Sequence, residues 1–247
     1  MNRHQLGFNA PAEYHQLFQQ FTVSHEALLD LIASRLSSPF ISILDAGCGT
    51  GLFTKMIAAR LPASCVYGID ISPQYIEHAR RTNEDKNISY LLSDFLEVGN
   101  ALPAADVTHI FFKGSFHLIE ANVDLDHLKN AGFYRLKQVV VIEKTERSLE
   151  TYPVPKAADQ RRRVFVSRRW QRDRLAIAQN KIIEVVTYGC NVSVNKSVYK
   201  NAIEKRQFSY LASVTDGDIL SWKNKFQKNN EDFLRIFEEN IAYIIHY

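Results

Sequence analysis

The spacing of hydrophobic residues along this chain predicts helices that alternate with short buried strands. Over residues 1–37, apolar side chains recur mostly at steps of three and four, the spacing of one helical face. The apolar runs at 40–44, 65–70, 88–95, 106–114 and 138–144 are short and continuous, as expected of buried strands. Helical patterns at 50–62 and 72–83 separate the first three runs, and Ser72 is the predicted cap of the second helix. This alternation is typical of a doubly wound α/β fold with a mostly parallel sheet.

The last third of the chain follows a different pattern. Residues 181–194 predict a long strand, and 195–214 and 215–226 predict two helices. Residues 232–247 alternate well enough to predict a final strand, with a helix as the alternative. Because no Gly/Pro/Ser-rich linker interrupts the chain, we expect a single domain over 1–247. It comprises a helical cap (1–39), a core (40–145), and C-terminal strands with a helical insertion (146–247).

Composition and charge narrow the function classes. The chain has 247 residues, 46% of them hydrophobic and 23% charged, and a net charge of +3. That charge is too small to indicate nucleic-acid binding by itself. No long apolar run or secretory leader is apparent, so we expect a cytoplasmic protein without a membrane span. The three cysteines (Cys48, Cys65 and Cys190) form no C-x-x-C pair, so neither a disulfide framework nor a metal site is expected.

A glycine-rich stretch, LDAGCGTGLF at 44–53, follows the first predicted strand. Glycines at 47, 49 and 51 give G-x-G-x-G, one residue short of the dinucleotide fingerprint G-x-G-x-x-G. No Lys-Ser or Lys-Thr follows, which excludes a phosphate-binding P-loop. The carboxylate of Asp45 would repel a pyrophosphate but suits a ligand with an ammonium or sulfonium group.

Two further acids stand where the next strands are expected to end. Asp70 comes 19 residues after Gly51, a position at which a carboxylate can accept hydrogen bonds from both ribose hydroxyls. Asp94 can accept from an adenine amine, with Phe95 beside the ring. An ammonium, a ribose and an adenine without a phosphate describe S-adenosylmethionine. Asp94 can equally be an ordinary loop acid, and Cys48 is expected to be a small buried residue rather than a nucleophile.

With LDAGCGTG, GID, SDF and FFKGSFHLI in this order, the chain resembles the class I S-adenosylmethionine-dependent methyltransferases over about residues 40–145. The resemblance implies a Rossmann-like seven-stranded sheet with an antiparallel last strand. It also implies cofactor contacts from the first strand and glycine turn, from the next strand ends and from the loop after the fourth strand: Asp45, Gly47, Cys48, Gly49, Asp70, Ile71, Asp94, Phe95 and Lys113. Tyr14 resembles the N-terminal tyrosine that covers the cofactor in this family, although it can also be a core aromatic. NAGFYRLK replaces the family's Pro-Gly-Gly before the fifth strand.

Candidate residues for the transfer step lie beyond the later strands. His117 follows the fourth strand and has a pKa range suited to a base, and Glu143 near the end of the fifth is a second candidate. Packing or capping for His117, and a structural ion pair for Glu143, are the alternatives. The insertion at 196–209 resembles a substrate lid, with a lining of Tyr188, Tyr199, Arg206, Phe208 and Tyr210, unless it is a helix packed on the sheet.

An arginine run at 161–174, with seven arginines and Trp170, can bind RNA or an acidic carrier protein. A solvated helix face is the interpretation that we favour. We therefore expect a methyltransferase that uses S-adenosylmethionine on a small molecule at oxygen or nitrogen. The alternatives are methylation of RNA or of a carrier-bound acyl group, and a non-catalytic subunit that binds S-adenosylmethionine. The sequence does not indicate the oligomeric state.

Overall fold

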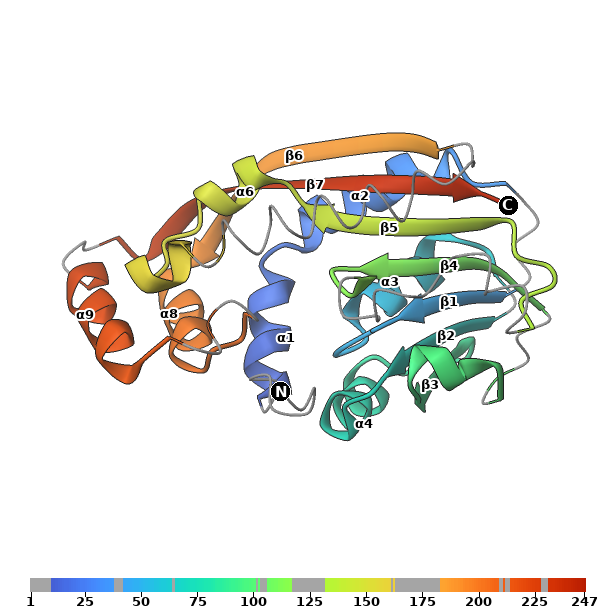
Figure 1. Cartoon of the computed structure of the whole chain (residues 1–247), viewed down its shortest axis with the longest axis horizontal. Helices are drawn as coiled ribbons and strands as arrows, with labels where there is room; N and C mark the ends of the chain where they lie inside the picture. Colours follow the sequence, from blue (N-terminus) through green and yellow to red (C-terminus); the bar gives the residue numbers. More distant parts are fainter. Residues whose placement is uncertain are drawn as a thin grey trace.

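The computed structural model of the chain describes residues 10–37, 42–63, 65–100 (without the side chains of 99 and 100), 102, 106–116, 132–160, 162, 183–208, 211, 214–227 and 231–247. Within these residues, seven strands form one sheet in the order β3-β2-β1-β4-β5-β7-β6 (Figure 1). The strands are β1 (Ser42–Ala46), β2 (Cys65–Asp70), β3 (Ile88–Leu92), β4 (Val107–Lys113), β5 (Gln138–Lys144), β6 (Ile183–Asn195) and β7 (Phe233–His246). The helices are α1 (Pro11–Gln19), α2 (Thr22–Ala33), α3 (Leu52–Arg60), α4 (Pro73–Thr82), the 3-10 helix η2 (Phe95–Asn100), α6 (Glu146–Glu150), α8 (Lys196–Glu204) and α9 (Asp216–Phe226).

The first five strands are parallel, and the last strand reverses direction. β1 lies between β2 and β4, and β5 continues the parallel arrangement beside β4. β7 is antiparallel to both β5 and β6, between which it lies. The predicted doubly wound fold and final strand are confirmed, and the helical alternative for 232–247 is wrong.

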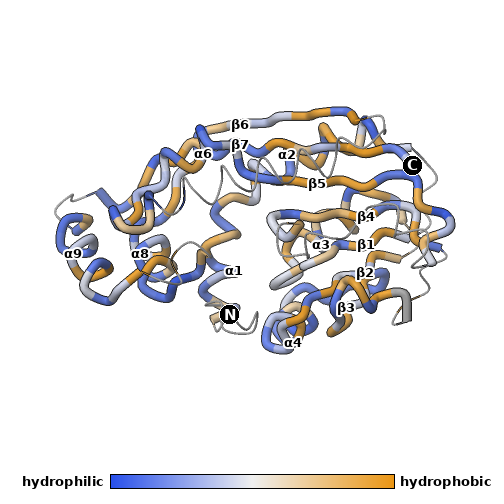
Figure 2. Tube along the Cα trace, viewed as in Figure 1, coloured by the Kyte–Doolittle hydropathy of each residue, from blue (hydrophilic) through white to orange (hydrophobic). Residues whose placement is uncertain are grey.

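The central strands are apolar on both sides because both faces of the sheet are covered. Along β4, Ile110 and Phe112 join one buried cluster, whereas Phe111 joins the cluster on the other face. Helices α2 and α3 cover that second face with residues such as Leu28 and Ile57. Figure 2 shows the hydrophobic residues concentrated along these strands, whereas α4 is largely hydrophilic.

β6 and β7 extend past β5 and carry a second cluster of helices (Figure 1). We call α6, α8, α9 and the extended ends of β6 and β7 the C-terminal lobe. Its core includes Tyr199 and Trp222, which join the same buried cluster as Leu17 and Phe21 from the N-terminal helical region. In Figure 1, α1 stands between this lobe and the sheet.

Several helix and strand boundaries differ from those predicted from the sequence. The first strand continues through Asp45 and Ala46, which pair with Gly68 and Ile69 of β2. β3 ends at Leu92, so Asp94 lies in the turn that leads to η2 rather than at the end of the strand. The predicted helix at 195–214 ends at Glu204, and residues 209, 210, 212 and 213 lie outside the described part. Before β5, Gly132 adopts a φ of 95°, and the following Phe133 is completely buried.

Candidate functional site

The glycine turn between β1 and α3 is folded back onto the end of β2. The backbone N–H groups of Gly47 and Cys48 both donate to the carbonyl oxygen of Ile69, at 2.8 Å each. Gly47 and Gly51 have φ of 76°, and a Cβ on either would lie 2.5 Å from an atom of Ser115 or Tyr90. The chain's own packing therefore requires glycine at these two positions. A Cβ on Gly49 would meet only ordinary contacts, the nearest 3.5 Å away in Tyr75, but the φ of 54° at this position also favours glycine.

Asp70 lies directly beside this turn. Its Oδ2 accepts the N–H of Gly49 and its Oδ1 accepts the N–H of Ser72, each at 2.9 Å. Ser72 is the N-cap residue of α4, as predicted, although its side chain makes no capping hydrogen bond. Burial raises the pKa of Asp70, and the backbone donors oppose this shift. Since a carboxylate oxygen can accept more than one hydrogen bond, Asp70 retains acceptor capacity for a ligand.

The side chains beyond β2 and β3 form a partly open apolar edge. Ile71 is 40% exposed, and Leu96 is 48% exposed. Phe95 is fixed by an edge-to-face contact with Phe112, with ring centroids 4.9 Å apart. Asp94 Oδ1 accepts the N–H of Leu96 at 3.0 Å, which closes the turn into η2.

Asp45 is a buried acid under the glycine turn. Its Oδ2 accepts a 2.6 Å hydrogen bond from the hydroxyl of Thr54 on α3. Burial raises the pKa of Asp45 to about 6, so its carboxyl group is ionised at neutral pH. Cys48 is buried against Ile76 and Ala79 of α4, and burial also raises its pKa. Its thiol is thus a packing group, as the sequence suggested.

A small cavity (≈ 50 Å³) lies between the glycine turn and the first helices. Its polar lining includes Asp45, His25 and Lys113, and its apolar lining includes Phe18 and Phe53. α1 covers this region directly, because His15 Nδ1 lies 3.2 Å from Thr50 Oγ1 in the turn. Tyr14 also lines the cavity, stacks on Phe18, and has its ring centroid 5.5 Å from that of Tyr75 on α4.

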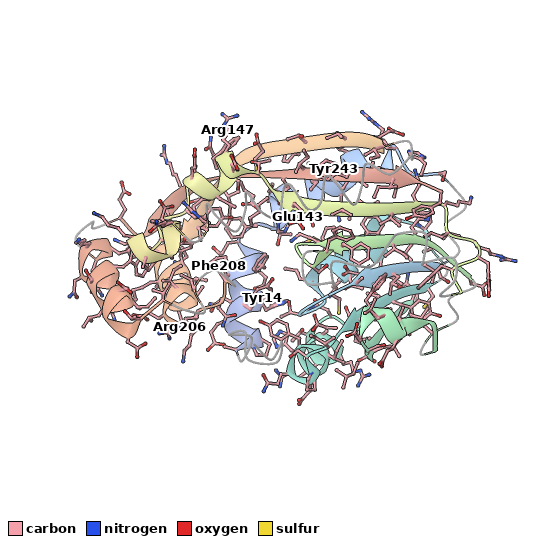
Figure 3. The ribbon with its side chains drawn as sticks, in the orientation of Figure 1. Tyr14, Glu143, Arg147, Arg206, Phe208 and Tyr243 are labelled. Carbon is pink, nitrogen blue, oxygen red and sulfur yellow. The ribbon has the colours of Figure 1, made fainter. Side chains whose placement is uncertain are left out.

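Of the two candidate bases, Glu143 belongs to the described part of the chain and His117 does not. Glu143 is buried on β5, and strand alternation places it on the face of Val139 and Val141. Lys113 shares a face with Phe111, the opposite one, so the sheet separates Glu143 from the cavity. Figure 3 labels Glu143 near β5 and Tyr14 on α1.

The residues predicted to line a lid mostly pack into the core of the C-terminal lobe instead of lining a surface. Tyr199 is completely buried and donates to the carbonyl of Pro153 at 3.1 Å, so the expectation that it lines a lid is wrong. Phe208 packs against this core, and Arg206 pairs with Asp216 (Figure 3 labels Phe208 and Arg206). Tyr188 instead packs against the sheet cluster formed by α2 and α3. Tyr210 lies outside the described part, and closure of 196–209 stays a prediction.

Sequence reasoning missed a buried polar cluster where the end of β5 meets the middle of β7, which we call the Glu238 cluster. The carboxylate of Glu238 accepts hydrogen bonds from Lys144, Tyr152, Ser148 and Asn240. Burial opposes ionisation of Glu238, but Lys144 beside it holds its pKa well below the usual range. A signal was present, since strand alternation puts Glu238 on the same face as Ile236 and Asn240, both of which are buried.

One member of the arginine run is described, and it is structural. The Arg162 side chain is 4% exposed and pairs with Asp159. It also donates to the carbonyls of Leu149 and Tyr152. Within the described part of the chain, no cluster of three or more metal-ligating side chains was found. No helix there is long and apolar enough to cross a bilayer.

Comparison with known proteins shows that part of the chain is similar to methyltransferases. Residues 43–140 match the family model described as a methyltransferase domain. A malonyl-[acyl-carrier protein] O-methyltransferase of Acetivibrio thermocellus is 40% identical over 57 residues, 23% of this chain and 20% of that protein. A ribosomal protein L11 methyltransferase of Paraburkholderia xenovorans is 38% identical over 91 residues, 37% of this chain and 26% of that protein. The matched part thus spans only about a fifth to a quarter of these relatives.

Solved structures show the same fold over most of the chain. A protein of Anaeromyxobacter dehalogenans described as a type II methyltransferase aligns with a TM-score of 0.56 at 12% identity, covering 89% of this chain and 94% of its own. Phospholethanolamine N-methyltransferase 2 of Haemonchus contortus, in complex with S-adenosylhomocysteine, aligns with a TM-score of 0.50 at 17% identity. It covers 99% of this chain and 59% of its own. At these identities the likeness shows the fold alone.

Proposed function

We propose that this chain, whose residues 43–140 match the model of a methyltransferase domain, is a class I methyltransferase that transfers the methyl group of S-adenosylmethionine to an acceptor. The observation that carries the proposal is the position of Asp70, which lies 2.9 Å from the N–H of Gly49 at the end of β2. A carboxylate against a glycine turn can accept ribose hydroxyls, while the exposed backbone tolerates close approach of the ligand. The fold places this pair at the carboxyl ends of the strands, where ligands of open α/β sheets bind.

The described residues of the site fit each part of this cofactor. Ile71 and Phe95, with the acceptor oxygens of Asp94, suit an adenine ring at the apolar edge. Asp45, ionised above about pH 6, suits the ammonium of the amino-acid part. When bound, the cofactor supplies an electrophilic methyl group on a sulfonium, which an oxygen or nitrogen of the acceptor attacks. The chain's own role is to orient the ligands and keep water away.

We further propose a small-molecule acceptor that is methylated at oxygen or nitrogen. The net charge of the chain is only +3, and the described arginine of the 161–174 run, Arg162, is occupied inside the protein. Both features favour this acceptor over RNA. The names of the relatives specify a carrier-bound acyl group and a ribosomal protein, so a carrier-bound acyl group stays the main alternative. His117 stays the candidate base if the acceptor must lose a proton.

Calorimetry with S-adenosylhomocysteine tests the cofactor site. Asp70→Ala removes both acceptor oxygens, and charged hydrogen bonds contribute roughly 1.5–3 kcal/mol each. We expect affinity to fall roughly 10- to 100-fold, because the freed ribose hydroxyls regain water. The matched control is Asp106→Ala, since Asp106 is half-exposed at the start of β4 and pairs with Arg135 at 3.2 Å. Absence of binding by the wild type, or unchanged binding by folded Asp70→Ala, would refute the proposal.

The acceptor class is tested by following label from S-adenosylmethionine carrying an isotopic methyl group. The enzyme is incubated with small metabolites, with acyl carrier protein bearing an acyl acid, and with RNA. We expect label in the small-molecule fraction only. Label in the carrier or RNA fraction would move the proposal to the corresponding alternative, and absence of transfer despite cofactor binding would favour a non-catalytic subunit.

A further inference from the structure

β6 forms a long outer edge of the sheet that lacks the usual protection against pairing (Figure 1). The strand has 13 residues and pairs with β7 in one unbroken register. From Val185 to Asn195 it contains neither proline nor a charged residue, the residue types that commonly guard exposed strand edges. Within the described part of the chain, β7 is the one partner that hydrogen-bonds to the backbone of 184–194. Since alternate residues of an antiparallel strand point their N–H and C=O groups away from the paired neighbour, β6 offers a row of donors and acceptors along its outer side.

The opposite edge of the sheet is formed by β3, and it is protected. β3 has only five residues, and Arg80 of α4 donates to the carbonyl oxygen of Tyr90 at 2.7 Å. A short edge strand with a charged side chain against its backbone is a common device that prevents association. The absence of such devices along the much longer β6 indicates an edge that is used for pairing.

α2 lies beside β6 and contacts it near both ends. Close to the start of β6, Arg35 Nη1 lies 3.4 Å from Glu184 Oε2. At the end of the strand, the N–H of Asn195 donates to the side-chain oxygen of Gln20, just before α2, at 3.4 Å. The helix therefore accompanies the strand along its length, on the face of the sheet that carries Val186.

The side of α2 that lies toward this edge is apolar and exposed. Val23 and Leu31 are 72% and 41% exposed. They are eight residues apart, and Arg35, which contacts β6, follows after four more, so the three share one side of the helix. On the other face of the sheet, the side chain of Val185 is also exposed. Apolar side chains thus flank the β6 edge on both faces, as expected of an association surface.

We propose that β6 pairs antiparallel with β6 of a second copy of this chain, about a two-fold axis. A second copy fits this edge because its strand has the same length, and because no like charges oppose one another along the uncharged stretch. Full overlap puts the middle residue, Gly189, on the axis and sets Thr187 opposite Asn191 of the second copy. It also brings Glu184 of each copy near the Lys196 end of the other, so that opposite charges approach. The exposed sides of the two α2 helices then face each other. This inference concerns assembly and is independent of the proposed function.

The dimensions of this surface suit a stable dimer. A strand of 13 residues at ~3.4 Å per residue is about 44 Å long. A standard interface buries about 800 Å² per partner, which over this length requires a contact only ~18 Å wide. A sheet with its side chains is about 10 Å thick and a helix about 10 Å across, so β6 and α2 together supply this width.

Paired charge variants test the strand pairing. Thr187 and Asn191 are exposed on one face of β6. Thr187→Lys/Asn191→Lys, and likewise Thr187→Glu/Asn191→Glu, would set like charges against each other across the axis. In sedimentation velocity over a concentration series, we expect a dimeric wild type and a dissociation constant raised roughly 100-fold or more in each double variant. An equimolar mixture of the two should dimerise again, because each Lys then opposes a Glu.

The matched control is Ser89→Lys, a new charge at an exposed position of the opposite edge, which should leave the dimer intact. A wild type that is monomeric at every concentration would overturn the inference, as would a dimer that the lysine variant leaves unchanged. A mixture that stays monomeric, with both variants folded by circular dichroism, would show that the two positions do not face each other across a shared edge and would equally overturn it.

Leu31→Ser tests the contribution of α2. The matched control is Leu220→Ser, the same change at an exposed leucine of α9. We expect the dissociation constant of the dimer to rise roughly 10- to 100-fold for Leu31→Ser, because each copy loses one buried leucine, and to stay unchanged for the control. Equal dissociation constants for the two variants would overturn the placement of α2 in the interface.

Discussion

At the scale of single residues, the candidate site contains two kinds of charged side chain. Some are costly to bury, and one is held in place by backbone hydrogen bonds. Asp45 and Lys113 are charged groups in a small cavity, each with its pKa shifted toward the neutral form by burial. Asp70, by contrast, is oriented by two backbone N–H donors. Charges kept at such a cost are a common feature of ligand sites.

Asp45→Asn should make the protein more stable at neutral pH but not in acid. The pKa of Asp45 is raised to about 6 in the folded state, so folding favours the protonated carboxyl group. Its stabilising contribution is full below the unfolded-state pKa of about 3.9 and is lost as the pH rises through 6. We expect Asp45→Asn to gain about 2–3 kcal/mol at pH 7.5 and little at pH 4. Urea unfolding at both pH values measures this, and an equal effect at both would contradict it.

Breaking the Glu238 cluster should be strongly destabilising. Glu238→Leu leaves the ammonium of Lys144, whose side chain is 20% exposed, without its counter-ion, so the loss should lie toward the lower end of the ~3–5 kcal/mol typical of broken buried pairs. Replacing both partners in Glu238→Leu/Lys144→Met should recover part of this loss, because two apolar groups leave no buried charge, although Tyr152, Ser148 and Asn240 still lose their acceptor. Denaturant unfolding of the single and double variants completes the cycle. Additive losses in the double variant would show that the two side chains do not act as a pair.

At the scale of elements, α1 covers the position where the cofactor is expected to bind. His15 contacts Thr50 in the glycine turn, and Tyr14 contacts Tyr75 on α4. The cavity beneath α1 measures ≈ 50 Å³, whereas small-molecule sites typically have about 300–1,000 Å³. The side chains of α1 therefore leave little free space at this end of the proposed site. The sequence could indicate Tyr14 but not this obstruction, because the contact joins helices whose relative placement depends on the whole fold.

Hydrogen exchange with and without S-adenosylhomocysteine tests this role of α1. We expect changed exchange in residues 11–19 and in the glycine turn, because both meet the ligand. α8 should change little, since Tyr199, Ala202 and Ile203 are buried in the lobe. Residues 138–144 of β5 provide the internal control, as their ladders are paired on both sides. Protection of 196–204 without a change in 11–19 would restore the lid predicted from the sequence.

At the scale of the whole molecule, the fold could largely be predicted from the sequence. The part of the site that would bind the methyl acceptor could not. Continuous apolar runs mark β1, β4 and β5 because both faces of the sheet are covered, and the glycine turn with Asp70 identifies the crevice. The Glu238 cluster escaped prediction because Lys144 and Glu238 are 94 residues apart. Their meeting depends on the register of β5 with β7, which periodicity alone does not fix.

The position of β7 between β5 and β6 has a consequence for protein synthesis. Among the described strands, β6 is hydrogen-bonded only to β7, which follows it by about 40 residues. A ribosome that adds roughly 5–20 residues per second needs ~2–8 s to make that interval. During this delay the backbone N–H and C=O groups of β6 that pair with β7 in the folded protein have no partner strand. The nascent chain therefore presents an incomplete sheet edge, a site for chaperones, until residues 233–246 have emerged.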